Sequence, residues 1–296
     1  MTLDFIFEVE RIPRAAEKVP AFAFREGGGG LAATAAVSIA SLGGAAEFWG
    51  RVGDDAHGQR LASLLRSHGV TPFVERSPGG RTPVSTMMVD RKGERMLAYF
   101  GSESLDTDPA WLPIETMTAL DAVLCDVRWT QGAQAVLTQA RAQGIPSILD
   151  VELAAPDHVA ALTTLGDYNL FSAPALTRFT GIDEPQAAIR AAADRTQGAV
   201  GVTLGNRGFL WLDNGRCWLQ PAFQVNAIET NGAGDVFHGA FAFAIARGDN
   251  VSHAARFASA TAALKCTRRG GWESMPSLSE VEALLAAQSA VTAAPL

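Results

Sequence analysis

The sequence Glu-Thr-Asn-Gly-Ala-Gly-Asp-Val-Phe-His-Gly-Ala-Phe-Ala-Phe-Ala-Ile-Ala, residues 229–246, joins a glycine-rich turn to an apolar, alanine-rich run. This pattern predicts a buried helix that begins at the turn. The small residues Gly232, Ala233 and Gly234 leave backbone N–H groups uncovered, and the helix dipole adds about half a positive charge there. Asp235 then lies beside an anion site, where it can take a proton from a hydroxyl that attacks a phosphate. The alternative is a core helix whose glycines only form a turn.

The composition is typical of a globular protein with a substantial core. The chain has 296 residues, of which 48% are hydrophobic, and a formal net charge of −7. The charge argues against a nucleic-acid partner or an anionic membrane surface. No apolar run is long enough to span a membrane, and residues 1–4 lack the features of a signal peptide. The three cysteines have no metal-ligand spacing, so we expect a cytoplasmic protein with reduced thiols and assign no metal-binding residue.

Short apolar segments alternate with helical stretches in the middle of the chain. The expected strands are residues 122–127, 147–151, 168–171 and 199–203, and the expected helices are residues 131–143, 155–165 and 185–197. This alternation predicts an α/β fold with a doubly wound, mostly parallel sheet flanked by helices. Ligands of such folds bind outside the carboxyl ends of the strands.

Two regions contain alternating apolar residues but do not fit this order of strands and helices. Residues 5–26 are predicted to be extended, and residues 83–90 and 94–100 are predicted to form a hairpin. We assign these strands, at approximately 5–26 and 80–100, to a small β-sheet lid within a single domain, residues 1–296. Apolar side chains on both faces of the lid predict a homodimer formed through it.

A second glycine-rich segment, Gly27–Gly30, leads directly into an alanine-rich stretch, Leu31–Leu42, that is predicted to be helical. Glycines in this position are consistent with a flexible loop. They are equally typical of a backbone that packs closely against a ligand at a helix N-terminus. These residues alone leave both interpretations open.

Three segments together resemble the signatures of the ribokinase-like, or PfkB-type, carbohydrate kinases. They are Gly28–Thr34, Val202–Gly208 and Glu229–Asp235, and they occur in the order that this family has. The resemblance covers almost the whole chain. It implies a ribokinase-like fold and the ATP-dependent phosphorylation of a sugar hydroxyl. The implied cofactors are ATP and Mg²⁺, and a monovalent cation is compatible with the resemblance.

The resemblance also implies roles for individual residues. Asp235 matches the catalytic base, and the N–H groups of Gly232, Ala233 and Gly234 match the anion hole for the transferred phosphoryl group. The residues on the implied ATP side are Thr203, Gly205, Gly208 and Thr230. The residues at or near the implied sugar site are Asp4, Gly28, Gly29, Gly30 and Arg51. Phosphoryl transfer requires mainly positioning and charge stabilisation, which such a set supplies.

The chain departs from the family pattern at several positions. Glu229 replaces an aspartate, and Thr34 stands where many relatives carry an asparagine that contacts the sugar. Ser172 and Ala175 replace the asparagine and glutamate of a motif that supports magnesium and phosphate. Relatives have an apolar strand before the residue that matches Asp4, whereas three residues precede it here, so we expect a translation start upstream of residue 1.

Within the family, three segments look like those of sulfofructose kinases, which phosphorylate the 1-hydroxyl of 6-deoxy-6-sulfofructose. The segments are Asp126–Trp129, Gly234–Ala240 and Phe257–Gly271. A sulfonate is a permanent anion and requires a fixed cation. Arg128, at the carboxyl end of an expected strand, and Lys18, in the lid, are placed to supply it. The expected partner of the protein is therefore a small anionic sugar.

Several alternatives follow from the same residues. Other kinases of this family act on fructose, ribose, keto-deoxy sugars or nucleosides, and a sugar sensor on the same fold needs no catalytic base. His238 lies one helical turn after Asp235, which suggests a charge-relay hydrolase, but no serine lies in a nucleophile elbow. Arg128 has its own alternative, because it could pair with a nearby carboxylate such as Asp150 or Glu152.

Overall fold

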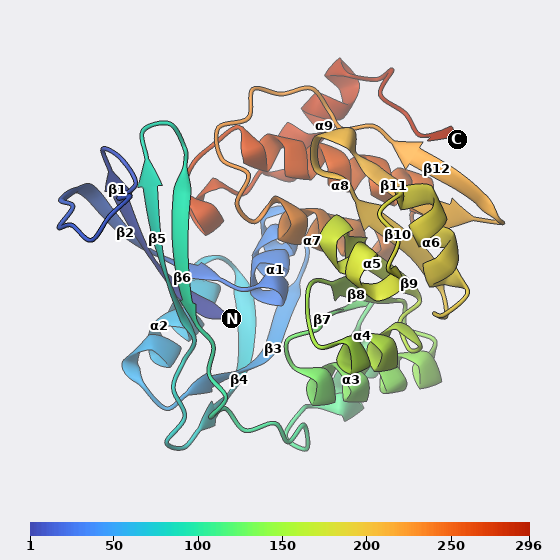
Figure 1. Cartoon of the computed structure of the whole chain (residues 1–296). Coiled ribbons are helices and arrows are strands. Elements are labelled where there is room, and N and C mark those ends of the chain that lie inside the picture. Colours follow the sequence, from blue (N-terminus) through green and yellow to red (C-terminus); the bar gives the residue numbers. More distant parts are fainter.

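The computed structural model describes residues 1–296 and contains a seven-stranded sheet between two layers of helices (Figure 1). The strand order is β13-β12-β11-β10-β9-β8-β7. The strands are β7 (Val123–Asp126), β8 (Ser147–Val151), β9 (Tyr168–Ser172), β10 (Ala199–Thr203), β11 (Phe209–Asp213), β12 (Arg216–Gln220) and β13 (Ala294–Pro295). Strands β7 to β10 are parallel to one another, and the other three pairs are antiparallel. The apolar segments between helices thus form the parallel part of the sheet.

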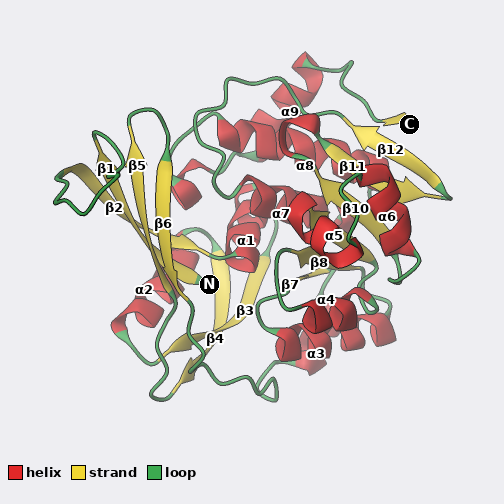
Figure 2. Ribbon diagram, viewed as in Figure 1, coloured by secondary structure: helices red, strands yellow, loops and turns green.

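Helices cover both faces of this sheet (Figure 2). One layer contains α3 (Thr130–Gln143), α4 (Pro156–Thr163), α5 (Ala173–Thr180) and α6 (Pro185–Ala193), and the other contains α1 (Leu31–Ser41), α7 (Ala233–Ala246), α8 (Val251–Cys266) and α9 (Leu278–Ala287). Successive side chains of a strand point to opposite faces. Accordingly Ile148 and Leu149, neighbours in β8, belong to the two separate apolar clusters that fill these layers.

Strands β3 (Ala46–Gly53) and β4 (Val70–Ser77) form a separate two-stranded parallel sheet, which packs with α2 (Ala56–Ser67) on a third apolar cluster. No hydrogen bonds join this sheet to the seven-stranded one. A cavity of about 1270 Å³ lies between them, and its two long sides are residues 44–51 and 119–126. The facing edges of β3 and β7 are therefore both unpaired.

Four strands form a further sheet, called the lid sheet here, that projects from the body of the molecule (Figure 1). They are β1 (Thr2–Val9), β2 (Ala21–Gly29), β5 (Val84–Asp90) and β6 (Arg95–Phe100), in the order β2-β1-β5-β6. All six residues of β6 are exposed. The large apolar side chains exposed on this sheet are Phe22, Phe24, Met96, Leu97, Tyr99 and Phe100.

The predicted fold class, an α/β fold with a small β-sheet lid, is confirmed by these elements. Most predicted strands and helices are present to within a few residues of their expected bounds. The sequence did not predict β4 or α5. The β4 segment contains Pro72 and two charged residues, which is typical of an edge strand rather than a buried one. None of the helices is long and apolar enough to cross a membrane.

Candidate active site

Two helices begin side by side where the parallel strands end. Near their starts, a Cβ atom on Gly232 of α7 would lie 3.6 Å from the side chain of Thr34 in α1. Near their ends, a Cβ atom on Gly44 would lie 3.1 Å from the ring of Phe243. The helices therefore run parallel, and their N-termini lie next to each other. Each N-terminus carries a partial positive charge, so together they favour an anion.

Asp126 connects the carboxyl edge of the sheet to the start of α1. It is the last residue of β7, opposite Asp150 of β8. Its Oδ2 accepts a hydrogen bond from the Ala32 N–H at 3.1 Å, and its Oδ1 accepts one from the Arg128 N–H at 2.8 Å. The negative charge of Asp126 thus stabilises the N-terminal turn of α1.

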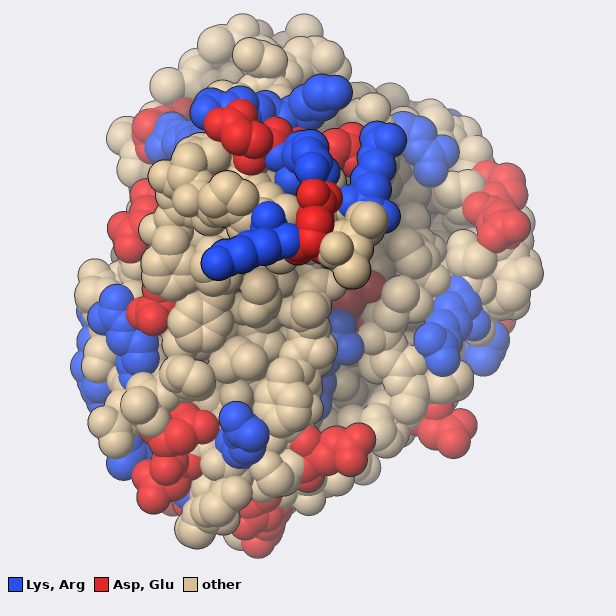
Figure 3. Space-filling model, turned by 60° about the vertical axis from the view of Figure 1, so that its left-hand side comes forward, with Lys and Arg blue, Asp and Glu red and all other residues tan.

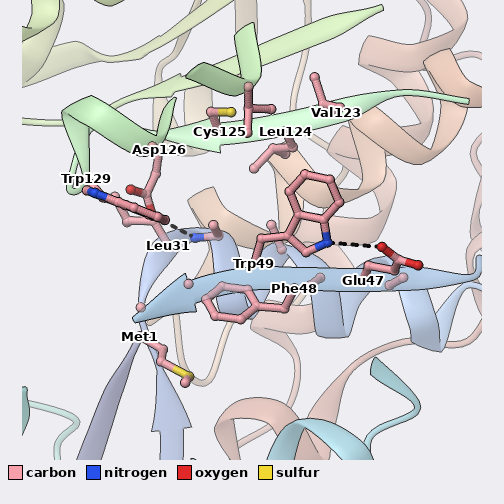
Figure 4. Close-up of a pocket in the computed structure, with 18 of the residues that line it drawn as sticks. Met1, Leu31, Glu47, Phe48, Trp49, Val123, Leu124, Cys125, Asp126 and Trp129 are labelled. Carbon is pink, nitrogen blue, oxygen red and sulfur yellow. Dashed lines mark hydrogen bonds between the residues drawn. The ribbon is translucent and has the colours of Figure 1, made fainter. Parts of the chain in front are cut away.

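A hollow opens at this edge and is continuous with the cavity between β3 and β7. Gly30, Arg51, Arg128 and Asp235 contribute to its lining. Figure 4 shows Asp126 and Trp129 at the end of β7, with Leu31 at the start of α1 beside them. In the space-filling view of Figure 3 the surface is deeply hollowed, and both basic and acidic side chains are visible inside. The hollow therefore brings four of the predicted site residues together.

Asp235 lies in the first turn of α7 and is half-buried. Desolvation raises the pKa of its carboxyl well above the usual range. Neighbouring carboxylates raise this pKa further, first Asp150 and then Asp126 and Glu152, whereas Arg128 lowers it. A carboxylate whose pKa is raised is a stronger base, as proton abstraction from a hydroxyl requires.

The backbone around Asp235 has free donors. The N–H groups of Gly232 and Gly234 donate no hydrogen bond, while the Ala233 N–H donates to the Thr230 carbonyl at 3.3 Å. Gly232 has a φ of 73°, in the left-handed region that glycine favours. Uncompensated N–H groups at a helix N-terminus are donors for a phosphate oxygen, so this turn fits a phosphoryl group.

Two arginines stand at the hollow in different surroundings. Arg51 of β3 donates to the backbone carbonyl of Asp106 at 2.5 Å, and its guanidinium lies 4.7 Å from the ring centroid of Trp129. Arg128 is exposed and donates to the Leu153 carbonyl at 3.0 Å. No carboxylate lies within ion-pair distance of Arg128, in contrast to the alternative that Asp150 or Glu152 neutralises it.

The predicted sugar-side glycines pack closely, but their contacts are with the chain itself. A Cβ atom on Gly28 would lie 2.2 Å from the ring of Trp272, and one on Gly29 would lie 2.2 Å from Oδ2 of Asp4. These segments therefore form the end of β2 rather than a flexible loop. Thr34 is buried, and its hydroxyl accepts a hydrogen bond from the Trp272 indole at 3.0 Å.

Asp4 lies on β1, where its carboxylate accepts a hydrogen bond from the Ser85 hydroxyl at 2.7 Å. Burial raises the pKa of Asp4, and the bond from Ser85 opposes this shift. Asp4 does not line the hollow. Lys18 is exposed in the connection between β1 and β2, also outside the lining, so the structure does not bring it together with Arg128.

The predicted ATP-side residues lie further along the carboxyl edge of the sheet. Thr203 ends β10 opposite Ser172 of β9, and Gly205 and Gly208 form the turn into β11. Thr230 is exposed in the loop before α7 and accepts a hydrogen bond from Arg95 of the lid sheet at 3.3 Å. None of these residues lines the hollow that contains Asp235.

His238 is buried on α7, and its Nδ1 lies 3.1 Å from Oδ2 of Asp150. This contact joins α7 to β8 in the interior. No serine donates to His238, so it lacks the partner that a charge-relay hydrolase requires.

Comparison with known proteins places this arrangement in a family. Residues 1–278 match the pfkB family of carbohydrate kinases. The chain belongs to the pfkB family of carbohydrate kinases. The predicted enzyme class, a carbohydrate kinase, is thereby confirmed.

Several pfkB relatives match along nearly their whole length. Ribokinase of Bacillus subtilis is 30% identical over 295 residues, which cover 96% of each chain. A putative ribokinase from Agrobacterium tumefaciens has a solved structure with a TM-score of 0.93 and 36% identity, covering 97% of this chain and 96% of that one. Arabidopsis thaliana ribokinase, solved with ribose and ATP, has a TM-score of 0.81 and 26% identity, with 96% of each chain covered.

Sequence reasoning did not single out the acidic neighbours of Asp235. Asp126 and Asp150 follow apolar runs in strands predicted to be parallel, so their position at strand ends was an available signal. The sequence suggested Asp150 and Glu152 as carboxylates near Arg128 but not as neighbours of Asp235, and Glu152 also accepts a hydrogen bond from the Ser172 hydroxyl at 2.9 Å. Trp272 lies 244 residues after Gly28 in the chain, and no local pattern connects them.

The raised pKa of Asp235 predicts how turnover depends on pH. The base works when deprotonated, so kcat should fall as pH drops through this pKa. Asp150→Asn removes a negative charge and should lower the pKa, which moves this acidic limb to lower pH. Arg128→Ala removes a positive charge and should move it to higher pH. The measurement is kcat as a function of pH. If the acidic limb of the profile shifts in neither variant, Asp235 is not the base whose pKa these charges set.

Proposed function

We propose that this chain transfers the γ-phosphoryl group of ATP to a hydroxyl of a small sugar bound in the hollow beside the lid sheet. The observation that supports this most directly is the position of Asp235. Its half-buried carboxyl, with a raised pKa, lies in the same helical turn as the free N–H groups of Gly232 and Gly234. A base and an anion site in the same helical turn are what phosphoryl transfer to a hydroxyl requires.

In the proposed reaction, Asp235 accepts the proton of the sugar hydroxyl as that hydroxyl attacks the γ-phosphorus. The N–H groups of Gly232 and Gly234 donate to the phosphoryl oxygens, where negative charge accumulates. The nucleotide lies along the carboxyl edge toward Thr203 and the turn that contains Gly205 and Gly208. Mg²⁺ bound to the ATP phosphates would supply positive charge that neutralises them. We propose residues 1–296 as one kinase domain that includes its lid.

We further propose that the sugar carries an anionic group, with 6-deoxy-6-sulfofructose as the specific candidate. Arg128 supports this choice, because it lies at the hollow, is exposed and has no carboxylate partner. The adjacent Trp129 limits water on one side and strengthens a charged contact. The relatives are named for ribose, deoxyribose and fructose, so these neutral sugars are the rivals to be tested.

We also propose that two copies of the chain pair through their lid sheets. The support is the exposed apolar surface on one face of this sheet, where Phe24 is 57% and Met96 46% exposed in the same cross-strand row as Phe7 and Met88. Contiguous apolar surface of this kind is uncommon on monomers, and the unpaired edges of β2 and β6 offer backbone groups for further pairing.

The substitution Asp235→Asn keeps the shape of the side chain and removes its basicity. Turnover should fall by at least ~10²-fold, while ATP affinity changes little. ADP production is measured over a panel of 6-deoxy-6-sulfofructose, fructose, ribose, deoxyribose and adenosine. Asp194→Asn, at the exposed end of α6, is the matched control and should behave as wild type. Near-normal turnover of Asp235→Asn would refute the assignment of Asp235 as the catalytic base. A wild-type protein that binds sugars but produces no ADP would favour the alternative that the protein is a sugar sensor.

The substitution Arg128→Ala tests the anionic substrate. Loss of the cation should raise KM for 6-deoxy-6-sulfofructose by the equivalent of about 2–5 kcal/mol and affect fructose much less. The matched control is Arg141→Ala, since Arg141 also donates to a backbone carbonyl at 3.0 Å, that of Thr164, away from the hollow. An unchanged ratio of activities on the two sugars would end the anion proposal and leave the kinase proposal standing.

The substitution Met96→Lys tests the pairing of lid sheets, because Met96 lies on the same face as Phe24. A charge at this position of β6 should shift the protein from dimer to monomer in light scattering, because the buried ammonium would lack a partner. Phe73→Lys, at a partly exposed apolar position on β4, is the control and should leave the mass unchanged. A wild-type protein that is monomeric at all concentrations would contradict the pairing.

A further inference from the structure

His238 and Asp150 form a buried pair between α7 and β8. Their side chains are 4% and 3% exposed, and Nδ1 of His238 lies 3.1 Å from Oδ2 of Asp150. Neither atom makes a hydrogen bond to any other group, and no lysine or arginine lies within ion-pair distance of Asp150. Aspartates are almost never fully buried unless they are paired, because a desolvated carboxylate is costly. The contact with His238 is therefore what allows a charged Asp150 in the interior.

The pair lies directly beneath Asp235. Asp150 points toward α7, because alternate residues of a strand share a face and Ile148 of β8 packs in the apolar cluster under α7. Asp235 and His238 are three residues apart on α7, so they share one face of that helix. Desolvation raises the pKa of Asp235 most, and Asp150 is the foremost charge that raises it further. The carboxylate that His238 contacts is thus also a neighbour of the proposed base.

No other basic side chain contacts these carboxylates. The charged groups that act on Asp235 come from the ends of β7 and β8, namely Asp126, Arg128, Asp150 and Glu152. Helix α1 has no charged residue, and Tyr168 of β9 packs against Phe241, further along α7. Burial lowers the pKa of Lys265 on α8, and none of these four groups contributes to that shift. His238 is the only basic side chain within ion-pair distance of any of the three carboxylates.

Loss of the imidazole would change the charge of Asp150. Removing one partner of a buried pair leaves an uncompensated charge in a poorly solvated place, and such a carboxyl takes up a proton instead. A neutral Asp150 no longer repels negative charge on Asp235. Asp235 would then give up its proton at lower pH and would be a weaker base.

We propose that His238 is a positioning residue for the base: its imidazole holds Asp150 in the charged form beneath Asp235, and this charge keeps Asp235 basic enough to accept the proton of a sugar hydroxyl. His238 is buried and does not line the hollow, so it acts through Asp150 rather than on the substrate. The effect on turnover rests on the proposed kinase function. The link from His238 through Asp150 to Asp235 exists in the protein without any ligand.

The test measures kcat as a function of pH in variants of His238. His238→Leu should move the acidic limb to lower pH by about 1 unit or more, the size of shift that one nearby charge produces. In the Asp150→Asn background the same substitution should cause no further shift, because no charge is left for His238 to hold. His238→Asn keeps an N–H group near the position of Nδ1 and should retain the limb of the wild type. A purely structural role would lower stability in all three variants without this pattern.

A second readout needs neither sugar nor ATP. In protein labelled with ¹³C-aspartate, the carboxyl resonance of Asp235 is identified by its absence from Asp235→Asn, and its titration is followed by NMR. It should titrate at lower pH in His238→Leu than in wild type. This titration decides the role of His238 even if no sugar is phosphorylated, in which case only the proposed kinase function fails.

The matched control is His253→Leu. His253 lies 4.0 Å from the carboxylate of Asp249 but is 72% exposed, so its removal should leave the limb and the titration unchanged. His238→Phe serves as the second variant if His238→Leu does not fold, with the same expected shift. Titration of Asp235 at the wild-type pH in His238→Leu, a shift to higher pH, or an equal further shift in the Asp150→Asn background would overturn the inference.

Discussion

The site depends on the close contact between α1 and α7. A Cβ atom on Gly239 would lie 2.5 Å from the Ala35 carbonyl oxygen, and the Ser38 hydroxyl donates to the Val236 carbonyl at 3.4 Å, so the backbones touch without intervening side chains. A larger residue at Gly239 would separate the helices. Since they run parallel, this one contact sets both N-termini beside the carboxyl edge of the sheet. The anion site and the end of β2 are therefore positioned by the same packing.

Charge is distributed asymmetrically around the turn that contains Gly232. Asp126, which lines the hollow, and Asp150 and Glu152 beneath it raise the pKa of Asp235, which strengthens it as a base, but their negative charge repels a phosphate. The repulsion has to be offset by fixed positive charge. The N-termini of α1 and α7 supply part of this charge.

The sequence predicts what depends on neighbouring residues and misses what depends on distant ones. Short apolar segments that alternate with helical stretches predicted the strands and helices of the main sheet. A glycine turn before an apolar run predicted that Asp235 lies at the start of a helix, as it does in α7. The contact of Trp272 with Gly28 joins residues far apart in the chain, as does the Arg25–Glu229 pair, and no local pattern encodes either. The separate sheet of β3 and β4 was also missed, because alternation predicts parallel strands but not whether their edges meet. The nature of the sugar stays a prediction.

The lid sheet contacts the loop before α7 from both of its edges. Arg25 on β2 pairs with Glu229 at 3.3 Å, and Arg95 on β6 donates to Thr230 at 3.3 Å. β2 and β6 are the two edge strands of the sheet, so the loop is contacted by both edges of the sheet. Contacts of this partly exposed kind contribute about 0–1 kcal/mol each. Each contact is therefore weak by itself, and the position of the sheet over the loop depends on both of them together.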